Sequence, residues 1–246
     1  MKIEFSPEQR EAHKLNAGAE SLKSPKHENQ DRVLVDVEHG AFGVFDGLGG
    51  YRGAEVAAAL ARDIVQTRLA ALPTDASLET TRDAVVTALR AADQAIKIKA
   101  RENSSLSRMC TTATVLKVWK STGGKRSLII GNVGDSHVYY LNADGNFSHI
   151  TGGGDELDQA LGDSYSALAP HVFTIDLVRT GDKALICSDG VYRPLTEVIL
   201  KEILDNERSP EIAAQKLASK AQERAAEDPY MHGGPPDDAS VIVVRL

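Results

Sequence analysis

Four short apolar segments of this chain have an aspartate at one end. The aspartates are Asp46, Asp135, Asp189 and Asp237. Short apolar runs bounded by turn residues are typical of β-strands. A residue at the end of a strand lies at the rim of its sheet, and a neighbouring glycine such as Gly47 lets the backbone turn sharply or approach a ligand. If these strand ends meet in the fold, several carboxylates converge.

Converging carboxylates require compensation, because like charges at close range raise each other's pKa values. Divalent cations provide it, and an all-oxygen ligand set favours Mg²⁺, Mn²⁺ or Ca²⁺ over zinc. No Cys/His spacing in the chain supports a zinc site. Two such ions can bind a phosphoryl group and lower the pKa of a bridging water for in-line attack. A single Asp-Gly after a strand is most often only a turn, so the prediction rests on the combination.

The order of the remaining patterns predicts an α+β domain with sheets in the middle. Since no linker or internal repeat divides the 246 residues, we expect one domain over residues 1–246. Strands are expected over residues 33–37, 41–45, 112–119, 127–133, 137–141, 147–150, 172–177, 183–187 and 240–246. Helices are expected from residue 53, over 82–99, over 195–205 and from residue 209, where Ser-Pro-Glu predicts a capped start.

Charge and composition exclude several classes of partner. The net charge of −7 argues against a nucleic acid or an anionic membrane as the main partner. The N-terminus is charged from the start, and no apolar run approaches the roughly 20 residues of a membrane helix. The two cysteines, Cys110 and Cys187, suggest no disulfide framework. We therefore expect a cytoplasmic protein that binds neither nucleic acid nor membrane. We also expect it to be a monomer.

Several motifs of the chain occur in the order found in one enzyme family. They are Glu28-Asn29-Gln30-Asp31, Val44-Phe45-Asp46-Gly47-Leu48-Gly49-Gly50, Thr111-Thr112-Ala113, Asn132-Val133-Gly134-Asp135-Ser136, Cys187-Ser188-Asp189-Gly190 and Asp237-Asp238-Ala239-Ser240-Val241. With these motifs the chain resembles the metal-dependent protein phosphatases, the type 2C serine/threonine phosphatases. The resemblance implies a four-layer αββα sandwich, in which two antiparallel sheets are flanked by helix pairs and the metals lie in a cleft at one end.

The resemblance also implies roles for individual residues. Asp46 would bridge two core Mg²⁺ or Mn²⁺ ions, and the carbonyl of Gly47 would bind one of them. Asp189 and Asp237 would complete the other, and Asp31 would act through water. The implied reaction is hydrolysis of phosphoserine and phosphothreonine by a water or hydroxide that bridges the two ions.

Two further carboxylates have implied roles outside the core pair. Asp135, together with Asp189, matches a weaker third metal site of the family. Asp238 stands where the family often has asparagine, and we expect it to support the ligands rather than to be one.

Two of the departures from the family pattern bear on the mechanism. Lys26 stands where an arginine usually holds the substrate phosphate, and lysine supplies charge without a bidentate fork. We expect Lys26 to bind phosphate, with a solvated surface lysine as the alternative. Leu48 stands where animal members carry a histidine proposed as general acid, which favours a bacterial-type enzyme and leaves the proton donor unassigned. His27 is nearby in the sequence, although a lone histidine is more often a surface residue.

The segment that forms a mobile flap in typical members is short here. It runs over residues 151–183 and begins with Thr151-Gly152-Gly153-Gly154, which predicts a reduced, glycine-rich loop and a more open cleft. A short helix over residues 155–160 that covers the site is the alternative. Leu161-Gly162 resembles the point where the chain returns to the core.

The expected substrate is a phosphorylated protein, phosphorylated by a cognate serine/threonine kinase. Bacterial relatives of this size often reverse such kinases, including those that control type VI secretion. Two other functions fit the sequence. One is a phosphatase-like regulatory module with little turnover, suggested by Lys26 and Leu48. The other is a metal hydrolase for small phosphate esters.

Overall fold

Two antiparallel sheets form the centre of the molecule in the computed structural model, which describes residues 15–49, 52–151, 157–164, 167–227 and 236–246. The first sheet has the strand order β1 (Asn16–Leu22), β10 (Ala239–Arg245), β9 (Lys183–Cys187), β6 (His137–Leu141) and β7 (Phe147–His149). The second has the order β2 (Arg32–Asp36), β3 (Ala41–Phe45), β4 (Ala113–Lys120), β5 (Arg126–Val133) and β8 (His171–Ile175).

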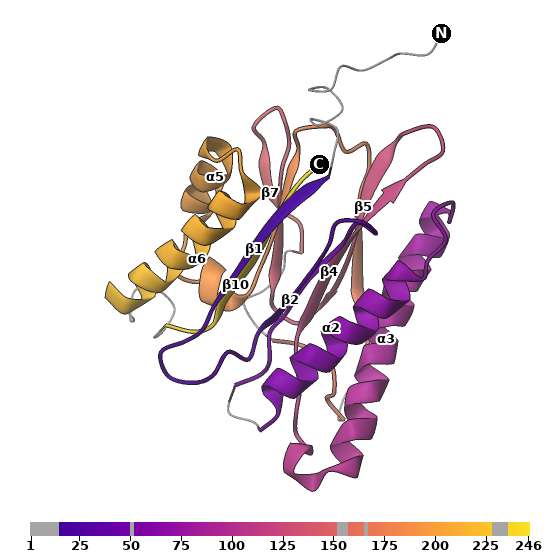
Figure 1. Cartoon of the computed structure of the whole chain (residues 1–246), viewed down its shortest axis with the longest axis vertical. Coiled ribbons are helices and arrows are strands. Elements are labelled where there is room, and N and C mark those ends of the chain that lie inside the picture. The colour runs from indigo at the N-terminus through magenta and orange to yellow at the C-terminus, as the bar shows by residue number, and fades with distance from the viewer. Residues whose placement is uncertain (1–14, 50–51, 152–156, 165–166, 228–235) are drawn as a thin grey trace.

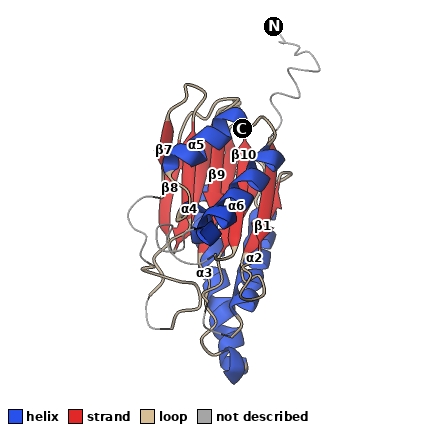
Figure 2. Cartoon of the chain, turned by 90° about the vertical axis from the view of Figure 1, so that its left-hand side faces the viewer, coloured by secondary structure: helices blue, strands red, loops and turns tan. Residues whose placement is uncertain are grey.

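Helices cover the outer face of each sheet. α2 (Ala54–Ala70) and α3 (Leu78–Glu102) lie on one side of the strands, and α5 (Glu197–Asn206) and α6 (Pro210–Glu227) on the other, as Figure 1 shows. In the view of Figure 2, α5 and α6 lie in front of the strands. Two shorter elements are α4 (Asp189–Tyr192) and the 3₁₀ turn Ser104–Leu106. The predicted αββα sandwich is therefore confirmed.

Apolar side chains alternate between two cores along the central strands. In β9, Leu185 and Cys187 pack with the α5–α6 layer, whereas Ala184 and Ile186 pack between the two sheets. This is the two-residue period expected of a strand that is buried on both faces. A third core joins α2 and α3 to the other sheet. The strands at the centre are thus held from both sides, and their ends form a rigid rim.

The predicted strand boundaries agree with the observed ones to within two residues. The helix predicted over residues 82–99 begins earlier, at Leu78, because the hydroxyl of Ser77 accepts a hydrogen bond from the N–H of Thr80 at 3.0 Å and caps it. None of the helices in the described ranges has the length and apolar character needed to cross a bilayer.

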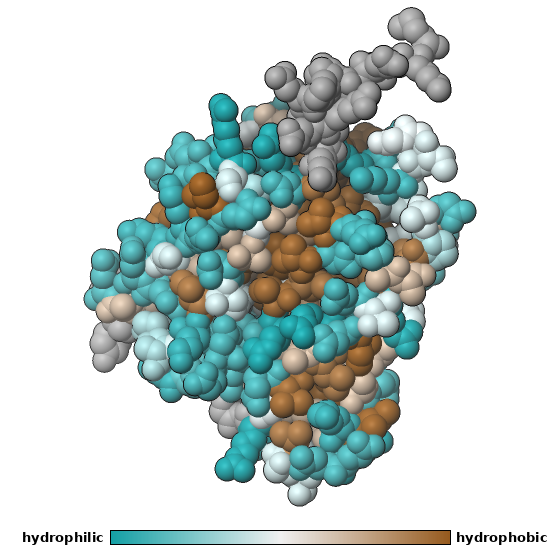
Figure 3. Space-filling model, viewed as in Figure 1, coloured by the Kyte–Doolittle hydropathy of each residue, from teal (hydrophilic) through white to brown (hydrophobic). Residues whose placement is uncertain are grey.

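The strand β1 was not predicted from the sequence. Its residues are mostly small or polar, and it pairs along its length with β10 from the other end of the chain. The start of α6 packs closely against β1 at Gly18, where a Cβ would lie 2.2 Å from the backbone nitrogen of Glu211. This close packing leaves no room for a larger side chain at that position. In Figure 3 hydrophobic surface shows over the region of β1 and β2, where Ala17 and Val33 pack against the core between the sheets.

Candidate metal centre

The four strand-end aspartates line one cleft of about 290 Å³. Asp46 follows β3, Asp135 follows β5, Asp189 follows β9 and Asp237 precedes β10. Since β3 and β5 belong to one sheet and β9 and β10 to the other, the cleft lies where the ends of both sheets meet. The structure thus brings together the carboxylates that the sequence places at strand ends.

The backbone around Asp46 is clamped to the start of β4. The N–H of Asp46 donates to the hydroxyl of Thr112 at 3.0 Å, and the N–H of Thr112 donates to the carbonyl of Asp46 at 2.7 Å. The hydroxyl of Thr111 donates to the same carbonyl at 2.9 Å. At Gly47 a Cβ would lie 2.7 Å from two backbone carbonyl oxygens, so a larger residue would displace this turn. The position of the Asp46 side chain is therefore set by backbone contacts.

The carboxylate of Asp46 lies in an environment that disfavours its negative charge. Burial, and after it the charge of Asp31, raises the pKa of Asp46 well above its ordinary value, and the charges of Asp189, Asp135 and Asp237 add to this effect. In the part of the chain that the structure describes, no N–H or O–H group donates a hydrogen bond to this carboxylate. Among the described residues, Asp46 is thus a partly buried acceptor without a hydrogen-bond donor.

Asp31 lies deeper than the residues that line the cleft. Its side chain accepts a hydrogen bond from the hydroxyl of Ser188 at 3.0 Å, and only 2% of the residue is exposed. Burial raises the pKa of Asp31 to about 8, although hydrogen bonds from Ser240 and Ser188 oppose this shift. Burial likewise raises the pKa of Asp189 to about 6. A nearby positive charge would therefore stabilise the ionised form of several carboxylates of the cluster.

Asp238 holds the loop that carries Asp31 against the start of β10. Its two carboxylate oxygens accept hydrogen bonds from the N–H of Ser24 at 2.6 Å and from the N–H of Gln30 at 2.7 Å. The side chain is buried. Asp238 thus positions its neighbours through the backbone, and its support of metal ligands stays a prediction.

Asp238→Ala is expected to weaken Mn²⁺ binding by about 10- to 100-fold, the usual effect of removing a residue that orients metal ligands. The loop of Ser24–Gln30 would lose two hydrogen bonds, while Asp46, Asp189 and Asp237 are not themselves changed. Isothermal titration with Mn²⁺ measures the effect. Asp176→Ala is the matched control. Asp176 also accepts a hydrogen bond, from Ser127, but it follows the end of β8 that lies away from Asp135 and the cleft. Equal Mn²⁺ affinity in both variants would contradict a positioning role for Asp238.

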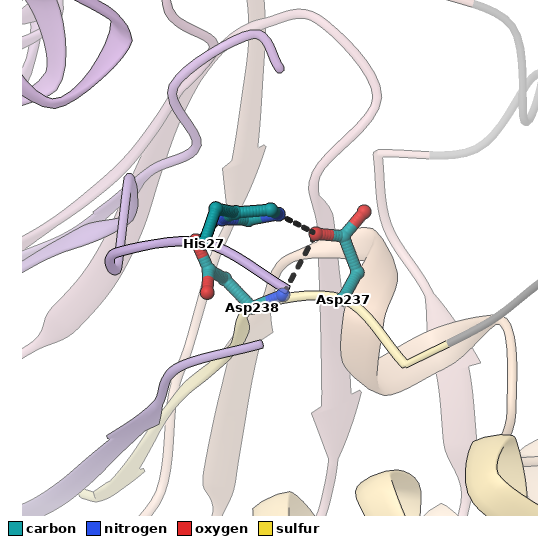
Figure 4. Close-up of side chains that lie close together, drawn as sticks. All are labelled: His27, Asp237 and Asp238. Atoms are coloured by element: carbon teal, nitrogen blue, oxygen red, sulfur yellow. Dashed lines mark hydrogen bonds and ion pairs between the residues drawn. The ribbon is translucent and has the colours of Figure 1, made fainter. Parts of the chain in front are cut away.

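His27 lies in the cleft next to two of these aspartates. Its Nε2 is 3.7 Å from Asp237 Oδ1, and its Nδ1 is 3.7 Å from Asp238 Oδ2. Figure 4 shows the three side chains, together with the hydrogen bond of 2.8 Å from the N–H of Asp238 to Asp237. Their ligand atoms all lie within 4.8 Å of one another, a spacing that could hold a metal ion. Although its side chain is 37% exposed, His27 belongs to the site.

Two sequence candidates lie at or outside the edge of the cleft. Lys26 is exposed and is not among the described residues that line the cleft, so its role in phosphate binding stays a prediction. Leu48 lines the cleft and places an apolar side chain at the position where animal members of the family carry a histidine. The proton donor to the leaving group is thus not identified by either position.

The predicted short flap lies largely outside the described residues, which resume at Leu157. Leu157 lines the cleft, and residues 157–160 are not helical. Leu161 is buried and forms a β-bridge with Thr111, as expected for the return to the core. The remaining part of the predicted short helix, residues 155–156, is not described. The reduced flap therefore stays a prediction.

Arg193 was not identified from the sequence. It follows α4 and contacts two aspartates of the cluster, with Nη1 2.6 Å from Asp189 Oδ2 and Nη2 3.5 Å from Asp135 Oδ2. The spacing of four residues from Asp189 was the available signal, but it points to contact only if the intervening residues are helical. Arg193 pairs with both carboxylates between which the resemblance implies a third ion, and that ion stays a prediction.

The core pair of ions fits the residues present. Asp46, Asp189 and Asp237 offer carboxylate oxygens on one cleft, and the burial and neighbouring charges that disfavour a negative charge on Asp46 are the strongest indication. Oxygen donors of this kind suit Mg²⁺ and Mn²⁺. A divalent cation would offset the repulsion between the neighbouring carboxylates.

Known proteins share both the sequence pattern and the fold. The serine/threonine protein phosphatase PstP of Mycobacterium tuberculosis is 30% identical over 241 residues, and the alignment covers 89% of this chain but only 42% of PstP. This chain thus spans less than half the length of that relative. A putative protein phosphatase of Mycoplasma pneumoniae is 26% identical over 244 residues, covering 85% of this chain and 90% of the relative.

Solved structures have the same architecture. The catalytic domain of PstP in complex with two manganese ions gives a TM-score of 0.73 at 25% identity, with 94% of this chain and 97% of that chain covered. The serine/threonine phosphatase Stp1 of Staphylococcus aureus gives a TM-score of 0.79 at 19% identity, with 94% and 95% covered. Residues 20–227 match the family described as protein phosphatase 2C. This match covers most of the chain, which therefore belongs to the protein phosphatase 2C family, a family of metal-dependent phosphatases.

Proposed function

We propose that this chain hydrolyses phosphoserine and phosphothreonine in proteins and needs two Mg²⁺ or Mn²⁺ ions to do so. The observation that carries the proposal is the convergence of strand-end carboxylates in one cleft, where burial and neighbouring charges disfavour the negative charge of Asp46. Membership of the protein phosphatase 2C family supports it. The two manganese ions of the PstP catalytic domain support the number of ions.

The proposed ligands divide between the two sheets. Asp46 would contact both ions and the carbonyl of Gly47 one of them, while Asp189 and Asp237 would hold the other and Asp31 would act through water. When bound, such ions polarise a phosphoryl group and acidify water. The protein holds this constellation on strand ends that are buried on both faces, so little reorganisation accompanies the reaction.

The rest of the cleft would receive the substrate. Asp237 is exposed, and His27 beside it is partly exposed, so this side of the cleft is open to solvent. Lys26 precedes His27, and we propose that its ammonium reaches the substrate phosphate from the rim of the cleft. A lysine there would act as a point charge rather than as a bidentate fork.

Further features of the protein are proposed on the same basis. A phosphoprotein made by a cognate serine/threonine kinase is the proposed substrate, and a cytoplasmic monomer the proposed state. Residues 1–246 are proposed to form a single catalytic domain. The pairing of β1 with β10 supports this, since strands from both ends of the chain share one sheet.

A comparison of substrates tests the proposed function against its two alternatives. With Mn²⁺ present, the rate of phosphate release is measured on phosphoserine and phosphothreonine peptides and on p-nitrophenyl phosphate. A protein phosphatase should release phosphate from the peptides. Turnover of p-nitrophenyl phosphate alone would identify a hydrolase of small esters. Binding of phosphopeptides without turnover of any substrate would identify a regulatory module.

A further inference from the structure

Arg193 is the one arginine or lysine among the described residues that line the metal cleft. Its guanidinium lies between Asp189 and Asp135, at 2.6 Å and 3.5 Å respectively. The two carboxylates belong to different sheets, following β9 and β5. Arg193 is therefore a positive charge that joins the two halves of the acidic cluster.

The position of Arg193 follows from the local backbone. α4 begins at Asp189, and the N–H of Arg193 donates to the carbonyl of Asp189 at 3.0 Å, so the two side chains project from the same helical face. The helix is anchored from below, because Tyr192 is buried and stacks on the ring of His137 with the centroids 3.6 Å apart. The pairing of Arg193 with Asp189 is thus built into the turn that follows β9.

A fixed guanidinium changes what the neighbouring carboxylates can bind. Arginine stays protonated throughout the physiological range, so its charge is permanent. Its planar fork offers donors to two carboxylates at once, whereas a divalent ion at the same place would lie beside a like charge. Asp135 and Asp189 therefore have a cation of the protein's own between them.

We propose that the guanidinium of Arg193 takes the place of a third metal ion between Asp135 and Asp189, so that this chain binds two divalent ions and not three. The proposal rests on the two-ion site of the proposed function. It assigns Asp135 a different role from the metal ligand that the family resemblance implies. Asp135 would hold Arg193, and Asp189 would serve both Arg193 and a core ion.

Counting bound Mn²⁺ tests the proposal without relying on turnover. Isothermal titration of the purified chain should give two ions. Arg193→Ala should bind a third ion, and its affinity for that ion should exceed the wild type's by at least about tenfold. The reason is that the repulsion between two like charges in contact is several times the free energy that corresponds to a tenfold change in affinity. The double variant Arg193→Ala with Asp135→Ala should return to two ions. Arg62→Ala is the matched control, because Arg62 also pairs with an aspartate, Asp63, on the surface of α2.

The outcomes separate this proposal from the proposed function. Three ions in the wild type, with the third lost in Asp135→Ala, would overturn the role of Arg193 and leave the two-ion function intact. Two ions in both the wild type and Arg193→Ala would also overturn it. No Mn²⁺ bound by the wild type would remove the proposed function itself. If circular dichroism shows that Arg193→Ala is unfolded, Arg193→Gln, which keeps part of the length and the polarity of the side chain without its charge, replaces it and should bind the third ion.

Discussion

Asp46→Asn is expected to lower kcat/KM for phosphate release by more than about 100-fold while the protein stays folded. Loss of residues that merely orient metal ligands usually costs 10- to 100-fold, so loss of the charge that bridges both ions should cost more. Without metal the variant should be at least as stable as the wild type, because burial and the neighbouring carboxylates disfavour the charge of Asp46. Steady-state kinetics and thermal melting in chelator measure the two effects.

The matched control for this variant is Asp63→Asn. Asp63 lies on α2, with a side chain that is 60% exposed, and pairs with Arg62. Its replacement should leave both the kinetics and the melting temperature close to those of the wild type, as is usual for an isolated surface pair. Wild-type turnover in Asp46→Asn would contradict a bridging role for Asp46.

Gly190→Ala is expected to reduce both stability and Mn²⁺ affinity. A Cβ at residue 190 would lie 2.1 Å from the carbonyl oxygen of Asp238, a backbone atom that no change of rotamer can move. The turn after Asp189 and the start of β10 would have to separate, and they carry two of the proposed ligands. Overpacking of this kind costs about 1–3 kcal/mol or more of folding free energy. Thermal melting without metal and titration with Mn²⁺ measure the two losses.

Gly123→Ala provides the comparison for this substitution. Gly123 lies in the turn between β4 and β5, and a Cβ there would have only the hydroxyl of Ser121 as a neighbour, at 3.8 Å. That variant should keep the stability and the Mn²⁺ affinity of the wild type. If Gly190→Ala matched Gly123→Ala in both stability and Mn²⁺ affinity, the close approach of residues 190 and 238 would be refuted.

The strands and the position of the aspartates at strand ends could be predicted because each depends on local sequence, whereas the meeting of those ends was implied by the family resemblance. An apolar run such as Ala41–Phe45 signals a strand by itself, and the residue after it must lie at a sheet rim. β1 carries no such signal. It consists of small and polar residues that are ordered by pairing with β10 and by the close packing of α6 on Gly18. Those contacts join residues far apart in the sequence.

The cation beside the aspartates could not be predicted for a similar reason. A helix of four residues, as α4 is, leaves no periodic pattern, so nothing in the sequence places Arg193 on the same face as Asp189. Its contact with Asp135 also depends on how the two sheets pack. The role of Asp238 in holding Ser24 and Gln30 likewise could not be predicted, because these contacts join residues that are far apart in the sequence.

Reversible dependence on metal is the most direct test of the central claim. Release of phosphate from a phosphothreonine peptide is followed as Mn²⁺ is supplied, removed with a chelator and supplied again. The carboxylate cluster predicts release with Mn²⁺, loss of release in chelator and recovery when the ion returns. Release that continues undiminished in chelator, or no release at any Mn²⁺ concentration, would contradict a phosphatase that works through these aspartates.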